Sequence, residues 1–303
     1  MGLNNKFLGF SAAIFAAALW GVSGAFAQFL FNEKHFNAEW LVTVRLLISG
    51  SIMLSLGILK GDKDVWHIWK NKKYASQLIV FSFLGMLLVQ YSYFITIFHS
   101  NAATATVLQY IGPVFIAIYL ALRLRKWPKP IEILAIGLAM LGTFLLVTHG
   151  DINSLTITPT ALIWGIISAL ALAAYTILPV HLLKEYSPIV IIGWSMLIAG
   201  TGMAIVYPPT HFPGIWDMET FWAVAFIILF GTLISFYIFL DAINNIGPQR
   251  ASLLACSEPL SATLIAVFYF GVQIEYLDWL GSSCIIFTIL LLTKIKKKEI
   301  PEH

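Results

Sequence analysis

Charged residues are scarce in this sequence: Asp, Glu, Lys and Arg make up 11% of its 303 residues, whereas hydrophobic residues make up 59%. Soluble globular domains carry about 25% charged residues. A soluble chain of this length could not bury so much apolar surface, so the composition excludes a soluble protein and predicts an integral membrane protein. The net charge of +3 is small. In so apolar a chain, basic residues indicate membrane topology better than a nucleic-acid patch.

Cysteine and clustered histidine are also lacking. The two cysteines, Cys256 and Cys284, lie in apolar segments, so we expect no disulfide and infer no oxidising compartment. The seven histidines fall in loops, at the ends of apolar segments or at the terminus, and no two have the helical spacing of metal ligands. No GxxxxGK[ST] phosphate-binding motif occurs. We therefore predict no metal site, no cofactor, no use of ATP and no enzymatic activity.

Long apolar stretches dominate what is present. Each is close to the ~20 residues that cross the hydrocarbon core as a helix. We predict ten transmembrane helices, at residues 8–31, 39–59, 75–98, 102–122, 131–148, 160–183, 189–207, 220–243, 249–271 and 276–293. Residues 25–27, Ala-Phe-Ala, resemble a signal-peptide cleavage site. The apolar stretch around them is too long for a signal h-region, so we expect it to remain as the first span.

The basic residues are distributed unevenly between the two sides of the predicted membrane. Sixteen of the eighteen Lys and Arg residues fall in connections on the N-terminal side, Lys34 falls on the opposite side, and Arg45 lies within a span. Cytoplasmic loops carry an excess of Lys and Arg. The asymmetry predicts a multi-pass protein of the cytoplasmic membrane with both termini in the cytoplasm.

The two halves of the chain resemble each other at an offset of 146 residues. LGMLLVQYSYF (84–94) aligns with FGTLISFYIFL (230–240), and the same offset places Pro113 opposite Pro259. We therefore divide the chain into two five-helix repeats, residues 1–149 and 150–303. Because five is odd, the second repeat enters the membrane from the opposite side, which is typical of many secondary transporters. The predicted fold class is an all-α polytopic membrane protein, with ten transmembrane helices in two inverted five-helix repeats.

The matched prolines, Pro113 and Pro259, lie near mid-depth in the fourth and ninth predicted spans. Proline removes a backbone donor and disfavours the helical conformation of the preceding residue, so we expect a loosened turn in both helices. Glu258 stands directly before Pro259 and is costly at the bilayer centre, so it should face the bundle interior or water. It either binds a proton, binds a cationic substrate group, or is a protonated acid hydrogen-bonded to a neighbouring helix.

Other side chains inside the spans are further candidates for a substrate site. Arg45 lies six residues from the outer end of its predicted span, so it either snorkels, packs, or binds a side-chain or substrate carboxylate. Aromatic and amide groups inside spans either pack or line a cavity, where rings stack on aromatic or cationic ligands. The remaining candidates are Trp20, Tyr91, Gln109, Tyr110, Trp164, Tyr175 and Tyr237.

Three motifs carry a resemblance to a known family: LWG (19–21) in the first predicted helix, and QYIGPV (109–114) opposite SEPLSA (257–262). With the predicted spans and repeats, the chain resembles the EamA group of the drug/metabolite transporter superfamily over about residues 8–293. RLRKWPKP (123–130) departs from the family pattern, being basic where an acidic residue often follows the fourth helix. The resemblance implies a ten-helix transporter with a central cavity and alternating access. Family substrates include amino acids, amines, quaternary ammonium compounds, nucleobases and sugar derivatives.

The leading hypothesis is a secondary active transporter for a small polar metabolite, an amino acid or an amine first, with proton linkage through Glu258. The alternative is a quaternary ammonium (choline-like) importer or a drug exporter of the same fold. A channel and a membrane-embedded enzyme are more remote hypotheses. The expected partners are a small-molecule substrate, protons and the lipid bilayer, without nucleic acid. We expect a monomer or a weak homodimer.

Overall fold

The computed structural model describes residues 3–294, except 126, 156, 211, 262 and 264–274. Within these residues the secondary structure is entirely helical, without strands. The α-helices are α1 (Leu3–Asn32), α2 (Ala38–Leu59), α3 (Asp64–His67), α4 (Lys72–Val80), α5 (Leu88–His99), α6 (Ala102–Gln109), α7 (Gly112–Leu124), α8 (Pro130–Thr148), α9 (Pro159–Ile177), α10 (Leu182–Glu185), α11 (Pro188–Val206), α12 (Met218–Ile228), α13 (Ser235–Ile246), α14 (Pro248–Ala255) and α16 (Tyr276–Lys294).

Eight helical segments in the described part of the chain are long and apolar enough to cross a membrane, which makes this a multi-pass membrane protein. They are Phe7–Asn32, Ala38–Leu59, Lys72–His99, Ala102–Leu124, Pro130–Thr148, Pro159–Glu185, Pro188–Val206 and Met218–Ile246. The first eight predicted spans agree with them to within three residues at each end. The tenth prediction falls on α16, whose described apolar part is Tyr276–Leu292. The ninth, 249–271, begins with α14 and lies partly outside the described residues.

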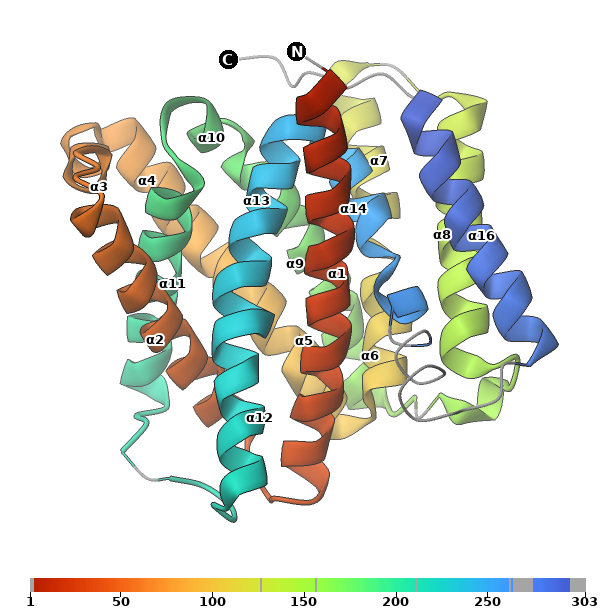
Figure 1. The fold of residues 1–303 in the computed structure, drawn as a ribbon, viewed down its shortest axis with the longest axis horizontal. Helices are drawn as coiled ribbons and strands as arrows, with labels where there is room; N and C mark the ends of the chain where they lie inside the picture. Colours follow the sequence, from red (N-terminus) through yellow and green to blue (C-terminus); the bar gives the residue numbers. More distant parts are fainter. Residues whose placement is uncertain are drawn as a thin grey trace.

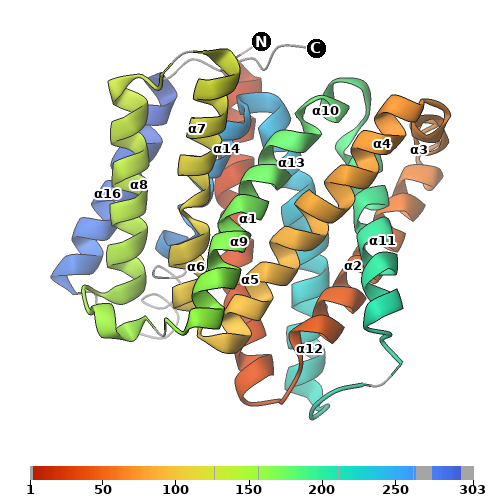
Figure 2. The ribbon, with the colours of Figure 1, turned by 180° about the vertical axis from the view of Figure 1, so that it is seen from behind.

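The long helices pack in pairs, each joining one helix from the first half of the chain to one from the second. Helix α2 packs on α11, α1 on α13, α5 on α9, and α8 on α16. The α2–α11 and α8–α16 pairs lie at opposite sides of the molecule, with the other two pairs between them (Figures 1 and 2). The start of α1 and the end of α16 lie at the same end of the bundle, together with α3 and α10 (Figure 1).

Two helical segments are interrupted at matching positions. Residues 110–111 form a turn between α6 and α7, just before Gly112-Pro113. Residues 256–257 form a turn after α14, just before Glu258-Pro259. The predicted loosening of the chain before each proline is thus confirmed. In the second case the break leaves a carboxyl group directly beside the interrupted backbone.

Two further irregularities are π-helical turns. They are η2 (Phe81–Leu87), which joins α4 to α5, and η5 (Leu229–Ile234), which joins α12 to α13. Such turns inside α-helices occur frequently at functional sites. The segments overlap when shifted by the 146-residue offset, and each contains one of the two matched glycines, Gly85 and Gly231.

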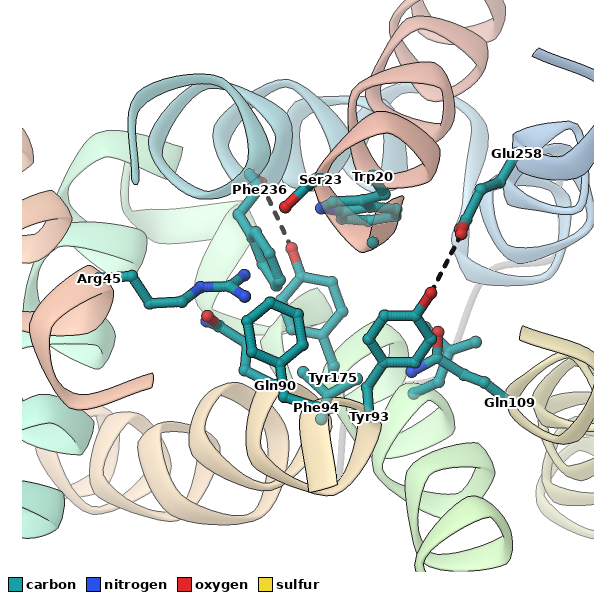
Figure 3. A pocket seen from close by; sticks show the side chains of 13 residues that line it. Trp20, Ser23, Arg45, Gln90, Tyr93, Phe94, Gln109, Tyr175, Phe236 and Glu258 are labelled. Carbon is teal, nitrogen blue, oxygen red and sulfur yellow. Dashed lines mark hydrogen bonds between the residues drawn. The ribbon is translucent and has the colours of Figure 1, made fainter. Parts of the chain in front are cut away.

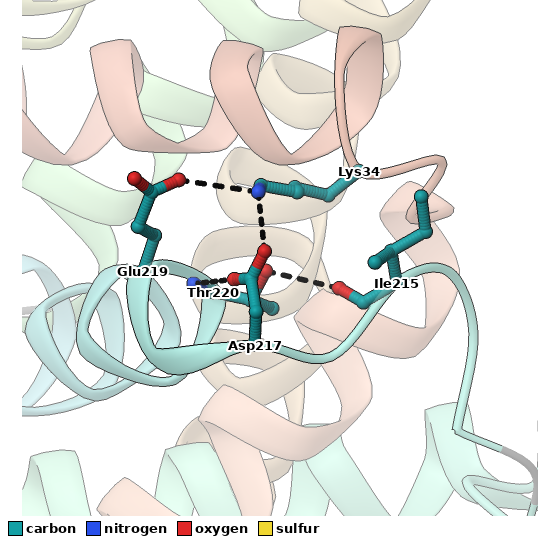
Figure 4. Close-up of polar contacts among 5 residues, drawn as sticks. All are labelled: Lys34, Ile215, Asp217, Glu219 and Thr220. Carbon is teal, nitrogen blue, oxygen red and sulfur yellow. Dashed lines mark hydrogen bonds and ion pairs between the residues drawn. The ribbon is translucent and has the colours of Figure 1, made fainter.

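An ion-pair cluster fixes the connection between α1 and α2 to the start of α12 (Figure 4). Lys34 Nζ lies 2.6 Å from Asp217 Oδ2 and 3.2 Å from Glu219 Oε2. Asp217 also caps α12, because its Oδ1 accepts a hydrogen bond from the backbone N–H of Thr220 at 2.9 Å. Two connections far apart in the sequence are therefore held together at the end of the bundle opposite the start of α1 (Figure 1).

Candidate functional site

A cavity lies inside the bundle (Figure 3). Residues of α1, α2, α5, α6, α9 and α13 line it, together with Glu258, which directly follows the turn after α14. The lining residues are Trp20, Ser23, Gly24, Arg45, Val89, Gln90, Tyr93, Phe94, Gln109, Leu172, Tyr175, Phe236 and Glu258.

Glu258 lies at one side of the cavity and is only 5% exposed. Three hydroxyl groups from the first half of the chain surround its carboxyl group. Tyr110 Oη donates to Oε2 at 2.6 Å. Tyr93 Oη donates to Oε1 at 3.3 Å (Figure 3). Thr106 Oγ1 lies 3.5 Å from Oε1 and 3.0 Å from the Tyr93 hydroxyl. Hydroxyl donors satisfy the carboxyl group without neutralising it, so the group keeps its capacity to bind a proton or a cation.

The helix break explains why Glu258 can take this position. Pro259 has no N–H, so it cannot donate to the carbonyl of Ala255, four residues earlier, as a continuous helix requires. The Tyr110 hydroxyl lies 2.7 Å from that carbonyl oxygen and supplies a donor from another helix. Tyr110 is 2% exposed and is not among the residues that line the cavity. Its hydroxyl therefore contacts Glu258 from within the packed protein and not from the cavity.

Arg45 contributes the second charged group of the cavity. Its side chain is buried inside the protein, with 3% exposed, so it does not extend to the membrane surface. The guanidinium carbon lies 4.4 Å from the centroid of the Phe94 ring and 6.0 Å from that of Phe236. No acid in the described part of the chain forms an ion pair with it. Arg45 and Glu258 thus face the same cavity without touching (Figure 3).

Aromatic rings form much of the remaining wall. Trp20 and Tyr175 both contact Phe236, with ring centroids at 5.1 and 5.3 Å, and both contact Phe239, at 4.9 and 6.1 Å. The Tyr175 hydroxyl donates to the backbone carbonyl of Phe236 at 3.3 Å. These contacts fix the rings between α1, α9 and α13, which favours a preformed wall over one assembled around a ligand.

The structure brings most of the predicted site residues to this cavity. Trp20, Arg45, Gln109, Tyr175 and Glu258 line it, and Tyr110 contacts Glu258. The remaining three predicted residues are not among its lining residues. Tyr91 and Trp164 instead pack against each other with ring centroids 5.4 Å apart, and Tyr237 is partly buried elsewhere on α13.

Sequence reasoning missed the face of α5 that lines the cavity. Gln90, Tyr93 and Phe94 stand at positions i, i+3 and i+4, so they share one side of the helix. Gln90 is a polar residue in an apolar span and is 3% exposed. The spacing of Gln90 and Tyr93 was the available signal for this face. Ser23 on α1 and Phe236 on α13 were also missed, and we find no sequence signal that singles them out.

The model of the EamA-like transporter family matches residues 7–148 and 159–294. The chain belongs to the EamA-like transporter family. This EamA protein is 38% identical over 295 residues to "Uncharacterized inner membrane transporter YicL" of Salmonella typhimurium, covering 97% of each chain. It is 24% identical over 296 residues to "Uncharacterized transporter YwfM" of Bacillus subtilis, covering 94% of each chain.

Structural similarity agrees with this assignment at the level of the fold. A solved crystal structure matches the EamA protein with a TM-score of 0.77 and 16% identity, covering 97% of this chain and 98% of that one. The predicted family resemblance is confirmed, and the relatives' names fit a transporter rather than an enzyme. A transporter role is therefore established at the level of the family.

Proposed function

We propose that this EamA protein is a secondary active transporter of the cell membrane that carries a small polar metabolite with an amine group, an amino acid or an amine. The observation that carries the proposal is the position of Glu258. It is buried, lies directly after the turn that follows α14 in the predicted ninth span, and lines the cavity inside the bundle. An ionisable side chain inside a membrane bundle is expensive, and such residues mark substrate, ion or proton pathways.

The surroundings of Glu258 suit both a cationic group and a proton. Its described partners are hydroxyl groups, so its charge has no basic partner among them. The rings of Trp20, Tyr93 and Tyr175 line the same cavity and attract a cation through their faces. Glu258 therefore alternates in our proposal between a proton and the substrate amine, which couples transport to the proton gradient.

We further propose ten transmembrane helices in two inverted five-helix repeats that rock against each other around the cavity. The two separate matches of the family model support this division. So do the helix breaks and π-helical turns that recur at the 146-residue offset. Discontinuous helices with a site near the midplane, at the interface of inverted repeats, are typical of alternating-access transporters.

Both termini are proposed to lie in the cytoplasm. The start of α1, the end of α16 and the short helix α3 beside the Lys-rich connection lie at one end of the bundle (Figure 1). Lys34 lies at the other end. The arrangement supports the orientation expected from the excess of basic residues in cytoplasmic loops.

Transport into proteoliposomes tests the proposal. Purified wild-type protein is reconstituted, a pH gradient is imposed, and uptake of radiolabelled amino acids and primary amines is measured. We expect saturable uptake of at least one compound that responds to the gradient and is abolished in Glu258→Gln. Glu185→Gln, which removes an exposed carboxyl group from α10, should transport normally. Non-saturable flux would indicate a channel, and gradient-independent uptake would exclude proton coupling.

A quaternary ammonium substrate is the second candidate. The number of aromatic rings around one carboxyl group favours it, because a permanently charged cation without N–H groups is recognised through ring faces. Labelled choline in the same assay separates the two candidates. Uptake of choline without competition from amino acids or primary amines would support this second function.

A further inference from the structure

Arg45 carries a buried guanidinium group that lacks hydrogen-bond partners for part of its N–H groups in the described part of the chain. Its Nε and Nη1 atoms have no hydrogen-bond partner among the residues that the structure describes. Its side chain is 3% exposed, and the described ion pairs all involve other residues. Burying an ion without a counter-charge is strongly unfavourable, and stacking on an aromatic ring offsets only part of that penalty. The position therefore needs an anion for full stabilisation.

Other unsatisfied polar groups surround the same part of the cavity. Gln90 is 3% exposed, and its Oε1 has no partner in the described structure, while its Nε2 contacts Met86 Sδ at 3.0 Å. Trp20 Nε1 likewise has no partner among the described residues. Figure 3 shows the guanidinium group of Arg45 and the amide of Gln90 directed toward each other from α2 and α5. Arg45 and Trp20 thus offer free N–H donors to a ligand, and Gln90 Oε1 offers an acceptor.

The guanidinium group is already oriented. Phe94 holds it at 4.4 Å and Phe236 at 6.0 Å, so two rings from different helices restrict its movement. A fixed, planar guanidinium group with free N–H groups is suited to binding a carboxylate through two parallel hydrogen bonds. A substrate carboxylate would supply the missing counter-charge. The apolar rings exclude water and strengthen such a pair.

We propose that Arg45 forms a carboxylate subsite, so that the substrate is a zwitterion with its carboxylate at Arg45 and its amine at Glu258. The inference rests on the proposed transport function and decides between its two substrate classes: an amino acid fits both charged groups, whereas a simple amine leaves Arg45 unpaired. The cavity lining also includes Val89, Leu172 and Phe236, which suit an apolar substrate side chain.

The test compares amino acids with their primary amides. L-Leucine, L-phenylalanine and L-threonine and the three corresponding amides are titrated into detergent-purified protein by calorimetry. Each amide keeps the amine and the side chain and lacks only the negative charge. We expect at least one amino acid to bind wild type roughly 10- to 100-fold more tightly than its amide, as for one charge-assisted bidentate pair. Arg45→Met should remove this preference by weakening the amino acid alone.

Two further variants separate recognition from folding. Arg45→Lys keeps the charge but loses the bidentate geometry, so the amino acid should bind several-fold more weakly and the amide unchanged. Glu258→Gln should weaken both compounds, because both carry the amine. A merely structural role for Arg45 would reduce binding of acid and amide equally in Arg45→Met and Arg45→Lys, and that result overturns the subsite.

Failure of the subsite and failure of the transport proposal give different results. If amides and simple amines bind wild type as tightly as amino acids, the carboxylate subsite is wrong and the proposed amine site at Glu258 stands. If the preference for the free acid persists in Arg45→Met, the carboxylate binds elsewhere. If none of the amine-bearing probes binds wild type, both proposals fail.

Discussion

The hydroxyl group of Tyr110 lies 2.7 Å from the carbonyl oxygen of Ala255, the carbonyl that Pro259 leaves without a helical donor. The same hydroxyl lies 2.6 Å from Oε2 of Glu258. A tyrosine hydroxyl has one hydrogen to donate, so it cannot fully satisfy both acceptors at once. A protonated Glu258 donates to Tyr110, which leaves the Tyr110 hydrogen for Ala255. An ionised Glu258 takes that hydrogen for itself, so the proton on Glu258 is linked to the hydrogen bonding of the helix break.

Tyr110→Phe removes this link. One of two buried acceptors, Ala255 O or Glu258 Oε2, loses its donor, and an unsatisfied buried group costs about 1–3 kcal/mol. We expect the variant to be less stable by about that amount and to transport more slowly. The stability is measured by denaturant unfolding in mixed micelles. Tyr119→Phe removes a hydroxyl from an exposed side chain on α7 and should change stability by less than about 0.5 kcal/mol. Equal stability of the two variants would contradict the role given to Tyr110.

Tyr91 and Tyr93 form a second matched pair, since they are neighbours on α5 with different surroundings. Tyr93 lines the cavity and donates to Glu258, whereas Tyr91 packs on Trp164 outside the cavity lining. Tyr93→Phe should weaken substrate binding about 3- to 10-fold, because it removes one hydrogen bond to the carboxyl group of Glu258. Tyr91→Phe should leave the affinity unchanged. A larger loss in Tyr91→Phe, measured as Kd by calorimetry, would place the substrate outside this cavity.

The same pair shows how far the sequence predicts the site. Each residue advances an α-helix by 100°, so Tyr91 and Tyr93 point to nearly opposite sides. The third span is apolar on most sides, and Gln90 with Tyr93 is a weak mark of the face that meets the cavity, because Ser92 and Thr96 mark another side as well. The depth of each residue of this span in the membrane was therefore predictable, whereas the rotation of the helix about its own axis was not. For this reason Tyr91, a predicted site residue, is not among the residues that line this cavity.

Features that depend on local chemistry were predictable. A span needs about 20 apolar residues, so the limits of the first eight spans followed from composition. Proline interrupts a helix because its ring removes the backbone N–H, so the turns before Pro113 and Pro259 were also predictable from the sequence. The surroundings of Arg45 were not predictable, because Phe94 and Phe236 belong to other helices and contact Arg45 only in the packed bundle.

Two glycines on α8 test the close approach of α8 to α16. A Cβ atom on Gly142 would lie 2.9 Å from the carbonyl oxygen of Gly281 and 2.9 Å from Ile285 side-chain atoms, whereas one on Gly137 would meet nothing within 4 Å. Gly142→Ala should destabilise the protein by about 1–3 kcal/mol through overpacking. Gly137→Ala should be neutral or stabilising by up to about 1 kcal/mol, because alanine favours the helix. Denaturant unfolding of both variants provides the comparison, and equal effects would contradict the packing.

The Lys34–Asp217 ion pair predicts a specific pH dependence. The hydrogen bond from Lys34, together with that from the Thr220 backbone, lowers the pKa of Asp217 from 3.8 to about 2. Because this pKa is depressed, the stabilisation is fully present above pH 3.8 and is lost as the pH falls toward 2. The pKa of Lys34 is raised above 10.5, chiefly by its hydrogen bond to Asp217, so the pair is also intact at neutral and mildly alkaline pH.

Asp217→Asn should therefore lower the melting temperature by a constant amount between about pH 4 and pH 10, and the difference from wild type should shrink below pH 3.8. The pair is partly exposed, so 1 M salt should reduce the difference. Glu219→Gln is the matched control, since Glu219 lies farther from Lys34 and is more exposed, and its effect should be smaller. Asparagine and a protonated aspartate both lack the charge that Lys34 attracts, and both can cap α12. A difference between wild type and Asp217→Asn that persists unchanged at pH 2 would therefore show that Asp217 does not act through its charge.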